Sequence, residues 1–430
     1  MRSTFRSLRI RNYRLYWTGA MVSNGGTWMQ RIAQDWLVLQ LTDNSGVALG
    51  ITTGLQFLPM LLFGLWGGVL ADRYDKRKLL LLTQVSFAVV GLTLGALDVT
   101  GVVEAWHVYL LALIFGVVTA VDNPARQAFV TEMVGPQDTS NAVALNSASF
   151  NTARIFGPAL AGLLINLVGT GLVFFINALS YVGVMIGLRM MRESELRRGG
   201  VAAREPGQLR EGLRYVRSRP DLLLPIVVVG FVGTFGFNFQ ITMALMAKEV
   251  FGRGAGSFGL LATAMAAGSL AGALIAARQA RPRARVFVQA AVVFGLLEVA
   301  AGFMPTYETF MVILVPVGVF AIGMATTANA YVQVSSVPSM RGRVMSLYML
   351  VFMGGTPIGA PLVGWVAGAL GAQWGMITGG AVSVVATLVA TLVLSRRQGL
   401  RLKPRIRPLP HWNVVSGDNE PAAVGAGERS

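Results

Sequence analysis

The chain has 430 residues, of which 54% are hydrophobic and only 13% are charged, whereas about 25% of the residues of a typical soluble domain are charged. It contains no cysteine and only two histidines, His107 and His411, which excludes disulfides, thiol catalysis and a histidine-based metal site within this chain. The formal net charge of +16 is compatible with nucleic acid or anionic lipid as a partner, and the placement of the basic residues decides between them.

Apolar runs close to the ~20 residues that cross a bilayer as a helix recur along the chain. Because these runs are continuous and do not alternate with polar residues, they predict helices and not barrel strands. No cleavable signal peptide is expected, since five arginines crowd the first fourteen residues and no small-residue cleavage site follows. In chain order, we expect twelve transmembrane helices at 15–41, 47–71, 78–98, 106–124, 141–168, 171–190, 222–247, 257–277, 286–304, 308–332, 343–368 and 372–395.

The longest internal polar stretch, 192–219, divides these helices six and six. The fold class is therefore predicted to be an all-α membrane protein with an N-terminal six-helix bundle at 1–191 and a C-terminal six-helix bundle at 221–396. A cytoplasmic linker at 192–220 is expected to include a short amphipathic helix at Gln208–Arg217. The tail, 397–430, is predicted to be disordered.

The two halves resemble each other at a constant offset: 116–121 aligns with 318–323, and 157–162 aligns with 359–364. Since six spans return the chain to the same side of the membrane, such halves are parallel repeats about an axis normal to the membrane. Transporters built in this way hold their substrate between the halves. The repeat thus predicts a pseudo-symmetric pair of bundles with a site at their interface.

The basic residues predict the orientation, because cytoplasmic loops of membrane proteins are enriched in Lys and Arg. With the N-terminus in the cytoplasm, only Lys248 and Arg253 lie in external loops, and Arg31 and Arg154 lie within spans. We expect both termini in the cytoplasm and a location in a bacterial inner membrane. The basic loops also attract anionic lipid headgroups, and their scatter over many short segments argues against nucleic acid as a partner.

The loop between the second and third predicted spans has a glycine, then Asp-Arg after three residues, then a basic cluster: Gly68, Asp72, Arg73, Lys76 and Arg77. This pattern resembles the signature loop of the major facilitator superfamily, in which it holds the cytoplasmic side shut while the protein opens outward. The resemblance implies that Asp72 caps a helix of the other half and that the basic residues pair with Asp122 on the fourth span. Asp75 departs from the family pattern, which has glycine there, and a simple positive-inside loop is the alternative.

The fifth span carries Gly157, Pro158 and Gly162, which resembles the antiporter signature of the same superfamily. Pro158 removes a backbone hydrogen bond and bends the helix, and the glycines permit close packing. The resemblance implies a pliable helix between the halves, whereas the residues alone are also compatible with an ordinary proline kink. The arginine of the fourth-span signature is missing, so Arg154 or Arg31 is expected to replace it.

Polar residues inside the spans mark the expected cavity, since a charge at a helix centre costs about 2.5–3.5 kcal/mol and needs water or a partner. In this superfamily the first, fourth, seventh and tenth spans line the cavity, with the fifth beside them. Spacing on one helical face selects the cavity candidates Asn24, Arg31, Asp35, Asn151, Arg154, Asn238, Asn329 and Gln333. Arg154 is expected near the middle of the membrane.

Asp35 is the first candidate for binding a coupled proton, because burial favours the protonated form of its carboxyl whereas a neighbouring arginine favours the ionised form. The alternative is a structural ion pair between Arg31 and Asp35, one helical turn apart. Glu298 in the ninth span is a weaker candidate, for which contact with lipid headgroups or a packing role is favoured. These alternatives stay open at the level of the sequence.

Within the superfamily, the runs at 26–30, 35–39, 71–77 and 151–158 look like the subgroup that contains the enterobactin exporter and macrolide efflux proteins. That resemblance implies efflux of a drug, a siderophore or another small amphipathic molecule, driven by protons. We expect a monomer without a cofactor. An importer or facilitator on the same fold is the first alternative. A membrane enzyme or signalling protein is the second, and it is disfavoured because there is no large soluble segment and no Walker loop.

Overall fold

The computed structural model describes residues 5–197, 208–278, 282–397, 401–405 and 411–415. The N-terminal half comprises η1 (Arg6–Arg9), α1 (Arg11–Leu41), α2 (Gly46–Arg73), α3 (Lys76–Val99), α4 (Ala105–Val134), α5 (Thr139–Arg189) and η2 (Glu193–Glu195). The C-terminal half comprises α6 (Gln208–Arg217), α7 (Pro220–Phe231), η3 (Val232–Gly236), α8 (Phe239–Leu245), η4 (Met246–Val250), α9 (Ala255–Ala277), α10 (Ala284–Gly302), α11 (Tyr307–Ser335), α12 (Arg341–Gly354), α13 (Thr356–Leu370) and α14 (Ala372–Arg397).

Ten helical stretches of the described chain are long and apolar enough to cross a membrane. One of them, α5, has 51 residues and leaves the helical conformation at Gly169, where φ is 79°. The chain reverses there, because Ala142 and Gly187, on either side of it, both lie against the start of α1, so α5 supplies two spans. The first helix, α1, is long enough to span at 31 residues but is too polar to meet the hydropathy criterion. The predicted twelve transmembrane helices in two six-helix bundles are thereby confirmed.

The seventh and eleventh spans are interrupted helices. Pro220–Val250 passes through the π-helical turns η3 and η4 on either side of α8, and α12 gives way to α13 around Gly355. π-helical turns misalign the backbone ladder and occur often at functional sites. The break in the seventh span, between η3 and α8, lies at Phe237 and Asn238.

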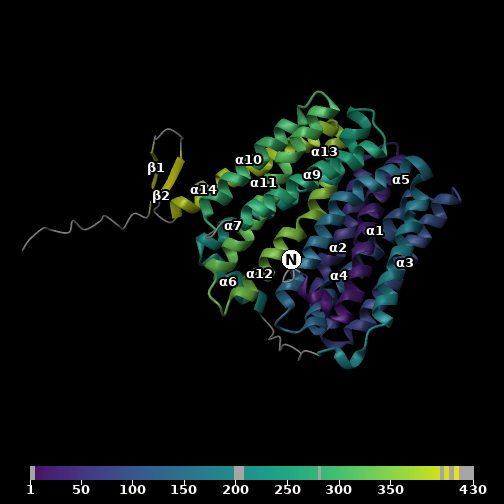
Figure 1. Ribbon diagram of the computed structural model, residues 1–430. Coiled ribbons are helices and arrows are strands. Elements are labelled where there is room, and N and C mark those ends of the chain that lie inside the picture. The colour runs from purple at the N-terminus through teal and green to yellow at the C-terminus, as the bar shows by residue number, and fades with distance from the viewer. Residues whose placement is uncertain (1–4, 198–207, 279–281, 398–400, 406–410, 416–430) are drawn as a thin grey trace, which may run out of the picture.

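The two bundles meet along two pairs of helices, α2 with α13 and α5 with α9. We call the side of the membrane on which α1 ends and α2 begins the closed end, and the opposite side, where α2 gives way to α3, the open end. Gly46 of α2 lies against Gly364 of α13, and Gly162 of α5 lies against Ala255 and Gly256 of α9, all near the closed end. The bundles lean together near α9 and α13 and lie further apart toward α6 and the N-terminus (Figure 1).

Aromatic and cation–π contacts reinforce the closed end. Trp36 of α1 stacks on Phe258 of α9 with ring centroids 6.4 Å apart, and the ammonium of Lys248 lies 5.1 Å from the centre of the Trp36 ring. Trp36 therefore touches two elements of the other bundle. A cation–π contact of this kind contributes about 0.5–2 kcal/mol, depending on how dry it is.

The linker helix α6 forms at the predicted residues and packs on the C-terminal bundle. Glu211 pairs with Arg343 of α12 at 2.7 Å, and Gly212 lies against the same arginine. In the tail, which was expected to be disordered, two short antiparallel strands form, β1 (Arg401–Arg405) and β2 (His411–Val415). The expectation for the rest of the tail falls on residues outside those described.

Candidate functional site

A cavity of about 240 Å³ lies between the two bundles, midway between the closed and open ends. The N-terminal bundle contributes Trp28 and Ile32 from α1 and Arg154 and Pro158 from α5. The C-terminal bundle contributes Phe237, Phe239, Gln240 and Met243 from the seventh span, Ala262, Met265, Ala266 and Ser269 from α9, and Ala321 and Ile322 from α11. A mostly apolar and aromatic wall with a few polar groups is the usual composition of a small-molecule site.

Arg154 is the charged residue of this cavity wall. Its Nη2 donates a hydrogen bond to Oδ1 of Asn151 at 3.0 Å, and its Nε has no hydrogen-bond partner. Among the residues that the structure describes, no carboxylate pairs with it. A guanidinium with unused donors next to a cavity is suited to bind a carboxylate, a phenolate or another acceptor of a bound molecule.

The side chains on the predicted polar face of α1 lie in different surroundings. Trp28 lines the cavity, whereas the guanidinium of Arg31 lies 5.0 Å from the centre of the Trp28 ring and 5.8 Å from that of Phe57 in α2. Asp35 is only 4% exposed, and its Oδ2 has no hydrogen-bond partner. No salt bridge joins Arg31 and Asp35 in the described residues, but their charges act on each other, so the alternative of a structural pair stays a prediction.

The other polar candidates separate into two groups. Asn24 donates to Oγ of Ser149 at 3.3 Å, which joins α1 to α5 beside the cavity. Asn238 is 95% buried and donates to the Thr234 carbonyl, so it stabilises the break in the seventh span. Asn238, Asn329 and Gln333 do not line this cavity, and their part in transport stays a prediction.

The glycine–proline segment of α5 lies where three helices converge. A β-carbon on Gly157 would lie 2.7 Å from Cβ of Trp28 in α1, and one on Gly162 would lie 2.7 Å from the Ala255 carbonyl oxygen in α9. The carbonyl of Pro158 faces Gly259 of α9. The segment thus packs against both bundles next to Arg154. Its role as a hinge stays a prediction.

The loop between α2 and α3 is bonded within the N-terminal bundle. Lys76 pairs with Glu132 of α4 at 2.7 Å, and Arg77 pairs with Glu193 and donates to the carbonyls of Leu188 and Arg189. Asp75 accepts a hydrogen bond from the Lys78 amide and caps α3, which explains how an acid replaces the glycine of the family pattern. The proposed role of Asp72 as the cap of a helix in the other bundle stays a prediction, as does that of the exposed Arg73.

One residue of the predicted loop mechanism, Asp122, was assigned to the wrong neighbours. Asp122 does not pair with the loop but accepts hydrogen bonds from Thr83, Gln84 and Arg126, because it lies about 15 Å deeper along α4 than Glu132 does. The close helix approach expected at Gly68 stays a prediction, and the neighbouring Gly67 makes one, since a β-carbon there would lie 2.0 Å from the Ala120 carbonyl oxygen.

Sequence reasoning missed Arg126, Glu132 and the aromatic residues Phe237 and Phe239. The fourth span was ended at residue 124, whereas α4 continues to Val134, so both charged residues were read as part of the loop. The spacing of Asp122 and Arg126, one helical turn apart, is the signal that could have identified their ion pair. No sequence signal distinguishes Phe237 and Phe239 from the many other apolar residues of the seventh span.

The match to a known family covers almost the whole chain. The family described as transmembrane secretion effectors, within the major facilitator superfamily, matches residues 2–413. The staphyloferrin A transporter of Staphylococcus aureus is 24% identical over 88% of this chain and 95% of its own length. Macrolide efflux protein A of Streptococcus pyogenes is 24% identical over 88% of this chain and 94% of its own length. The enterobactin exporter of Citrobacter koseri is 26% identical over 86% of this chain and 88% of its own length.

Solved structures show the same fold. A bacterial homologue of the human lysosomal transporter Spinster, in an inward-facing and occupied conformation, superposes with a TM-score of 0.70 at 16% identity, over 91% of this chain and 97% of its own. These matches confirm the predicted resemblance to the enterobactin exporter and macrolide efflux subgroup. The chain therefore belongs to the transmembrane secretion effector family, and it is a multi-pass membrane transporter of the major facilitator superfamily.

Proposed function

We propose that this protein exports a small amphipathic molecule, such as a drug or a siderophore, across a bacterial cell membrane in exchange for protons. The cavity between the bundles is the observation that carries this proposal. It combines one arginine with aromatic, methionine and small side chains, so it suits a molecule that has an apolar body and an acidic or acceptor group. Relatives of this chain are named for staphyloferrin A, enterobactin and macrolides.

The proposed orientation places both termini in the cytoplasm, so that the open end faces the cytoplasm and the closed end faces outward. The structure would then represent the inward-facing state of a monomer, ready to receive substrate from the cytoplasm. Export requires the contacts of Trp36, Gly162 and Gly364 at the closed end to separate and the open end to close. The loop ion pairs made by Lys76 and Arg77 lie within one bundle, so they can persist during that rocking motion.

Asp35 is proposed as a proton carrier next to the cavity. It is buried one helical turn beyond Ile32, which lines the cavity, and its Oδ2 lacks a hydrogen-bond donor. A carboxyl in such surroundings gains or loses a proton when its exposure to water changes. Movement of α1 during the rocking motion would provide that change.

Transport in proteoliposomes with an imposed pH gradient tests the proposal. The panel comprises erythromycin, staphyloferrin A, enterobactin and ethidium, and the expected result is substrate movement against the proton flow that stops when the gradient is collapsed. Asp35→Asn should abolish the dependence on the gradient. Uptake into the compartment that corresponds to the cytoplasm would instead identify an importer, and movement of no compound above empty liposomes would contradict this substrate class.

Arg154→Ala is expected to weaken binding of the acidic members of the panel by roughly 10- to 150-fold, because a charge-assisted hydrogen bond is worth about 1.5–3 kcal/mol. Tryptophan fluorescence quenching on titration with each compound gives the affinity, since Trp28 lies in the same wall. Arg154→Lys, which keeps the charge, should lose less affinity for these compounds than Arg154→Ala does. The matched control is Arg253→Ala, which removes an exposed arginine outside the cavity and should leave affinity unchanged. Equal affinities for wild type and Arg154→Ala would show that Arg154 does not contact substrate.

A further inference from the structure

A second buried acid lies outside the cavity wall, in the C-terminal bundle. Glu298 of α10 is only 2% exposed, which corrects the prediction of contact with lipid headgroups. Its Oε2 has no hydrogen-bond partner, and no ion pair to it occurs in the described residues. A buried carboxylate without a partner is costly, whereas a neutral carboxylic acid that donates a hydrogen bond is tolerated.

The carboxyl of Glu298 lies against the break in the seventh span. A β-carbon on Gly236, the last residue of η3, would lie 3.2 Å from Oε2 of Glu298 and 2.7 Å from Oγ of Ser383. A β-carbon on Gly379 of α14 would lie 3.1 Å from Oε1 of Glu298 and 2.6 Å from the Phe235 carbonyl oxygen. A protonated Glu298 therefore has a backbone acceptor nearby, in a segment where the π-helical turn disturbs the regular ladder.

Among the described side chains of the elements packed against α10, no other charged group faces Glu298. Ala372–Leu394 of α14 and the whole of η3 contain no acidic or basic residue. The charged residues of the remaining neighbouring elements lie at helix ends or have other contacts. Asp221 in α7 accepts from Arg219, and Glu308 in α11 is exposed near Arg253. Arg285 is in the first turn of α10, Lys248 in η4 lies over Trp36 and Glu249 is exposed. The tyrosines of α11, Tyr307 and Tyr331, lie near its two ends.

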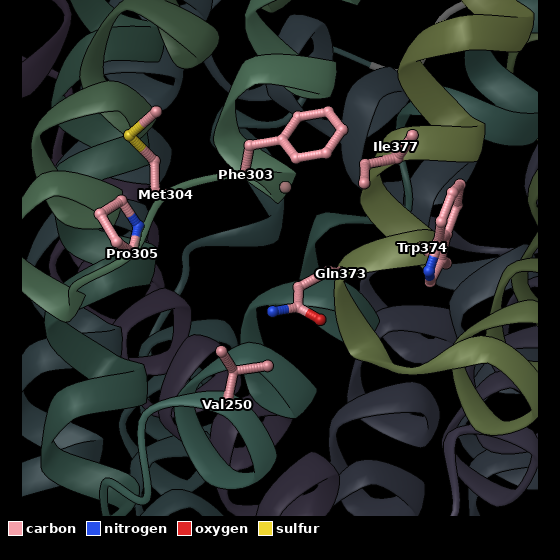
Figure 2. A pocket seen from close by; sticks show the side chains of 8 residues that line it. Val250, Phe303, Met304, Pro305, Gln373, Trp374 and Ile377 are labelled. Carbon is pink, nitrogen blue, oxygen red and sulfur yellow. The ribbon is translucent and has the colours of Figure 1, made fainter.

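A pocket of about 280 Å³ opens at the closed end, one helical turn from Glu298. Figure 2 shows the side chain of Gln373 among Val250, Phe303, Ile377 and Trp374. Gly302 also lines this pocket, and residues four apart on a helix lie above one another on the same face, so Glu298 lies directly below it. The pocket therefore lies about one turn of α10, ~5.4 Å along the helix axis, from the level of Glu298.

The same acid is joined to the transport cavity by aromatic packing. Phe294, one turn from Glu298 on α10, packs edge-to-face against Phe237 at 5.6 Å and Phe239 at 5.8 Å between ring centroids. Both phenylalanines line the cavity and flank the break in the seventh span. A change at Glu298 that alters the break would thus move two residues of the cavity wall.

We propose that Glu298 is a second proton-binding site, which exchanges its proton through the pocket around Gln373 and acts on the cavity through the break in the seventh span. The step is the binding of one proton by the Glu298 carboxylate, which becomes a neutral acid that donates a hydrogen bond. Substrate binding and proton binding at this site then affect each other equally, as linkage requires. The consequence for transport rests on the proposed proton-coupled export, whereas the proton site itself does not.

Infrared difference spectroscopy of the full chain in lipid tests the site without any substrate. The expected result is a carboxylic acid C=O band that disappears on going from acid to alkaline pH in wild type and in Glu308→Gln, an exposed control, and that is lost in Glu298→Gln. Identical spectra for wild type and Glu298→Gln would overturn the proposal. If Glu298→Gln does not fold, modification of wild type by dicyclohexylcarbodiimide replaces it: a Glu298 adduct that alkaline pH prevents supports the site, and no adduct contradicts it.

The proposed route of the proton through the pocket is tested by hydrogen–deuterium exchange. The measured quantity is the rate at which the C=O band of protonated Glu298 shifts after transfer to heavy water. Because the chain has no cysteine, Gln373→Cys carries a unique thiol in the pocket, and a bulky thiosulfonate reagent on it should slow the exchange. Glu308→Cys is the control at the same end, and its modification should leave the rate unchanged. Equal rates for the modified variants would overturn the assigned route. Absence of proton-driven transport of every panel compound would contradict the proposed function while leaving a titrating Glu298 in place.

Discussion

Replacing Asp122 by alanine is expected to destabilise the N-terminal bundle by about 3–5 kcal/mol, the usual effect of removing one partner of a buried ion pair. The side chain of Asp122 is only 5% exposed, and its carboxylate accepts from Arg126 at 2.9 Å. It also accepts from Oγ1 of Thr83 at 2.7 Å and from Nε2 of Gln84 at 3.0 Å. Without the acid, the Arg126 guanidinium and the Gln84 amide lose this acceptor in the interior, whereas the Thr83 hydroxyl keeps the Leu80 carbonyl.

Unfolding of the purified protein by dodecyl sulfate, followed by tryptophan fluorescence, measures this effect. The double variant Asp122→Ala/Arg126→Ala should be less destabilised than the sum of the two single variants, because it leaves no unpaired charge. Glu195→Gln is the matched control, since it removes one partner of an exposed pair with Arg192 that is worth about 0–1 kcal/mol. A loss of less than about 1 kcal/mol for Asp122→Ala would place this pair in the class of solvated ion pairs.

The second large effect concerns the equilibrium between the state in which the closed end is shut and the state in which it is open. Alanine at Gly259 is expected to disfavour closure of the closed end, because its β-carbon would lie 2.2 Å from the Pro158 carbonyl oxygen. Alanine at Gly364 would do the same, with its β-carbon 2.2 Å from the Gly46 carbonyl oxygen. Such overpacking costs about 1–3 kcal/mol per site, which corresponds to a roughly 5- to 150-fold change in the equilibrium. The double variant should therefore favour the state in which this end is open.

Cross-linking of an engineered cysteine pair reports that equilibrium. Val47→Cys and Gly368→Cys place two thiols where α2 meets α13, since a β-carbon on Gly368 would lie 3.9 Å from Cγ2 of Val47. The pair should cross-link efficiently in the wild-type background and poorly when Gly259→Ala and Gly364→Ala are added. The control is Gly25→Ala, whose β-carbon meets no atom within 4 Å. Unchanged cross-linking in a folded double variant would contradict the view that these contacts separate during transport.

Several features of the site were readable from residues that are close in sequence. The length and continuity of apolar runs indicated the spans, including the two spans of α5 on either side of the reversal at Gly169. The repeat predicted two pseudo-symmetric bundles, and Gly116 faces α2 in the way that Gly318 faces α9. Arg154 was placed in the cavity wall from its spacing on the fifth span together with the resemblance to the superfamily. These inferences succeed because hydropathy and helical periodicity are local properties of the chain.

The amino-acid sequence by itself determined a twelve-span membrane fold in two repeated halves, an amphipathic linker helix and a small set of intramembrane polar residues. Only the tertiary structure decided that Lys76 pairs with Glu132 and Asp122 with Arg126, that Arg31 turns to aromatic rings, and that Glu298 lies under a pocket beside the break in the seventh span. Each of these contacts depends on the rotation and depth of helices that are far apart in sequence. Periodicity gives the face of a residue on its own helix, but packing decides what that face meets.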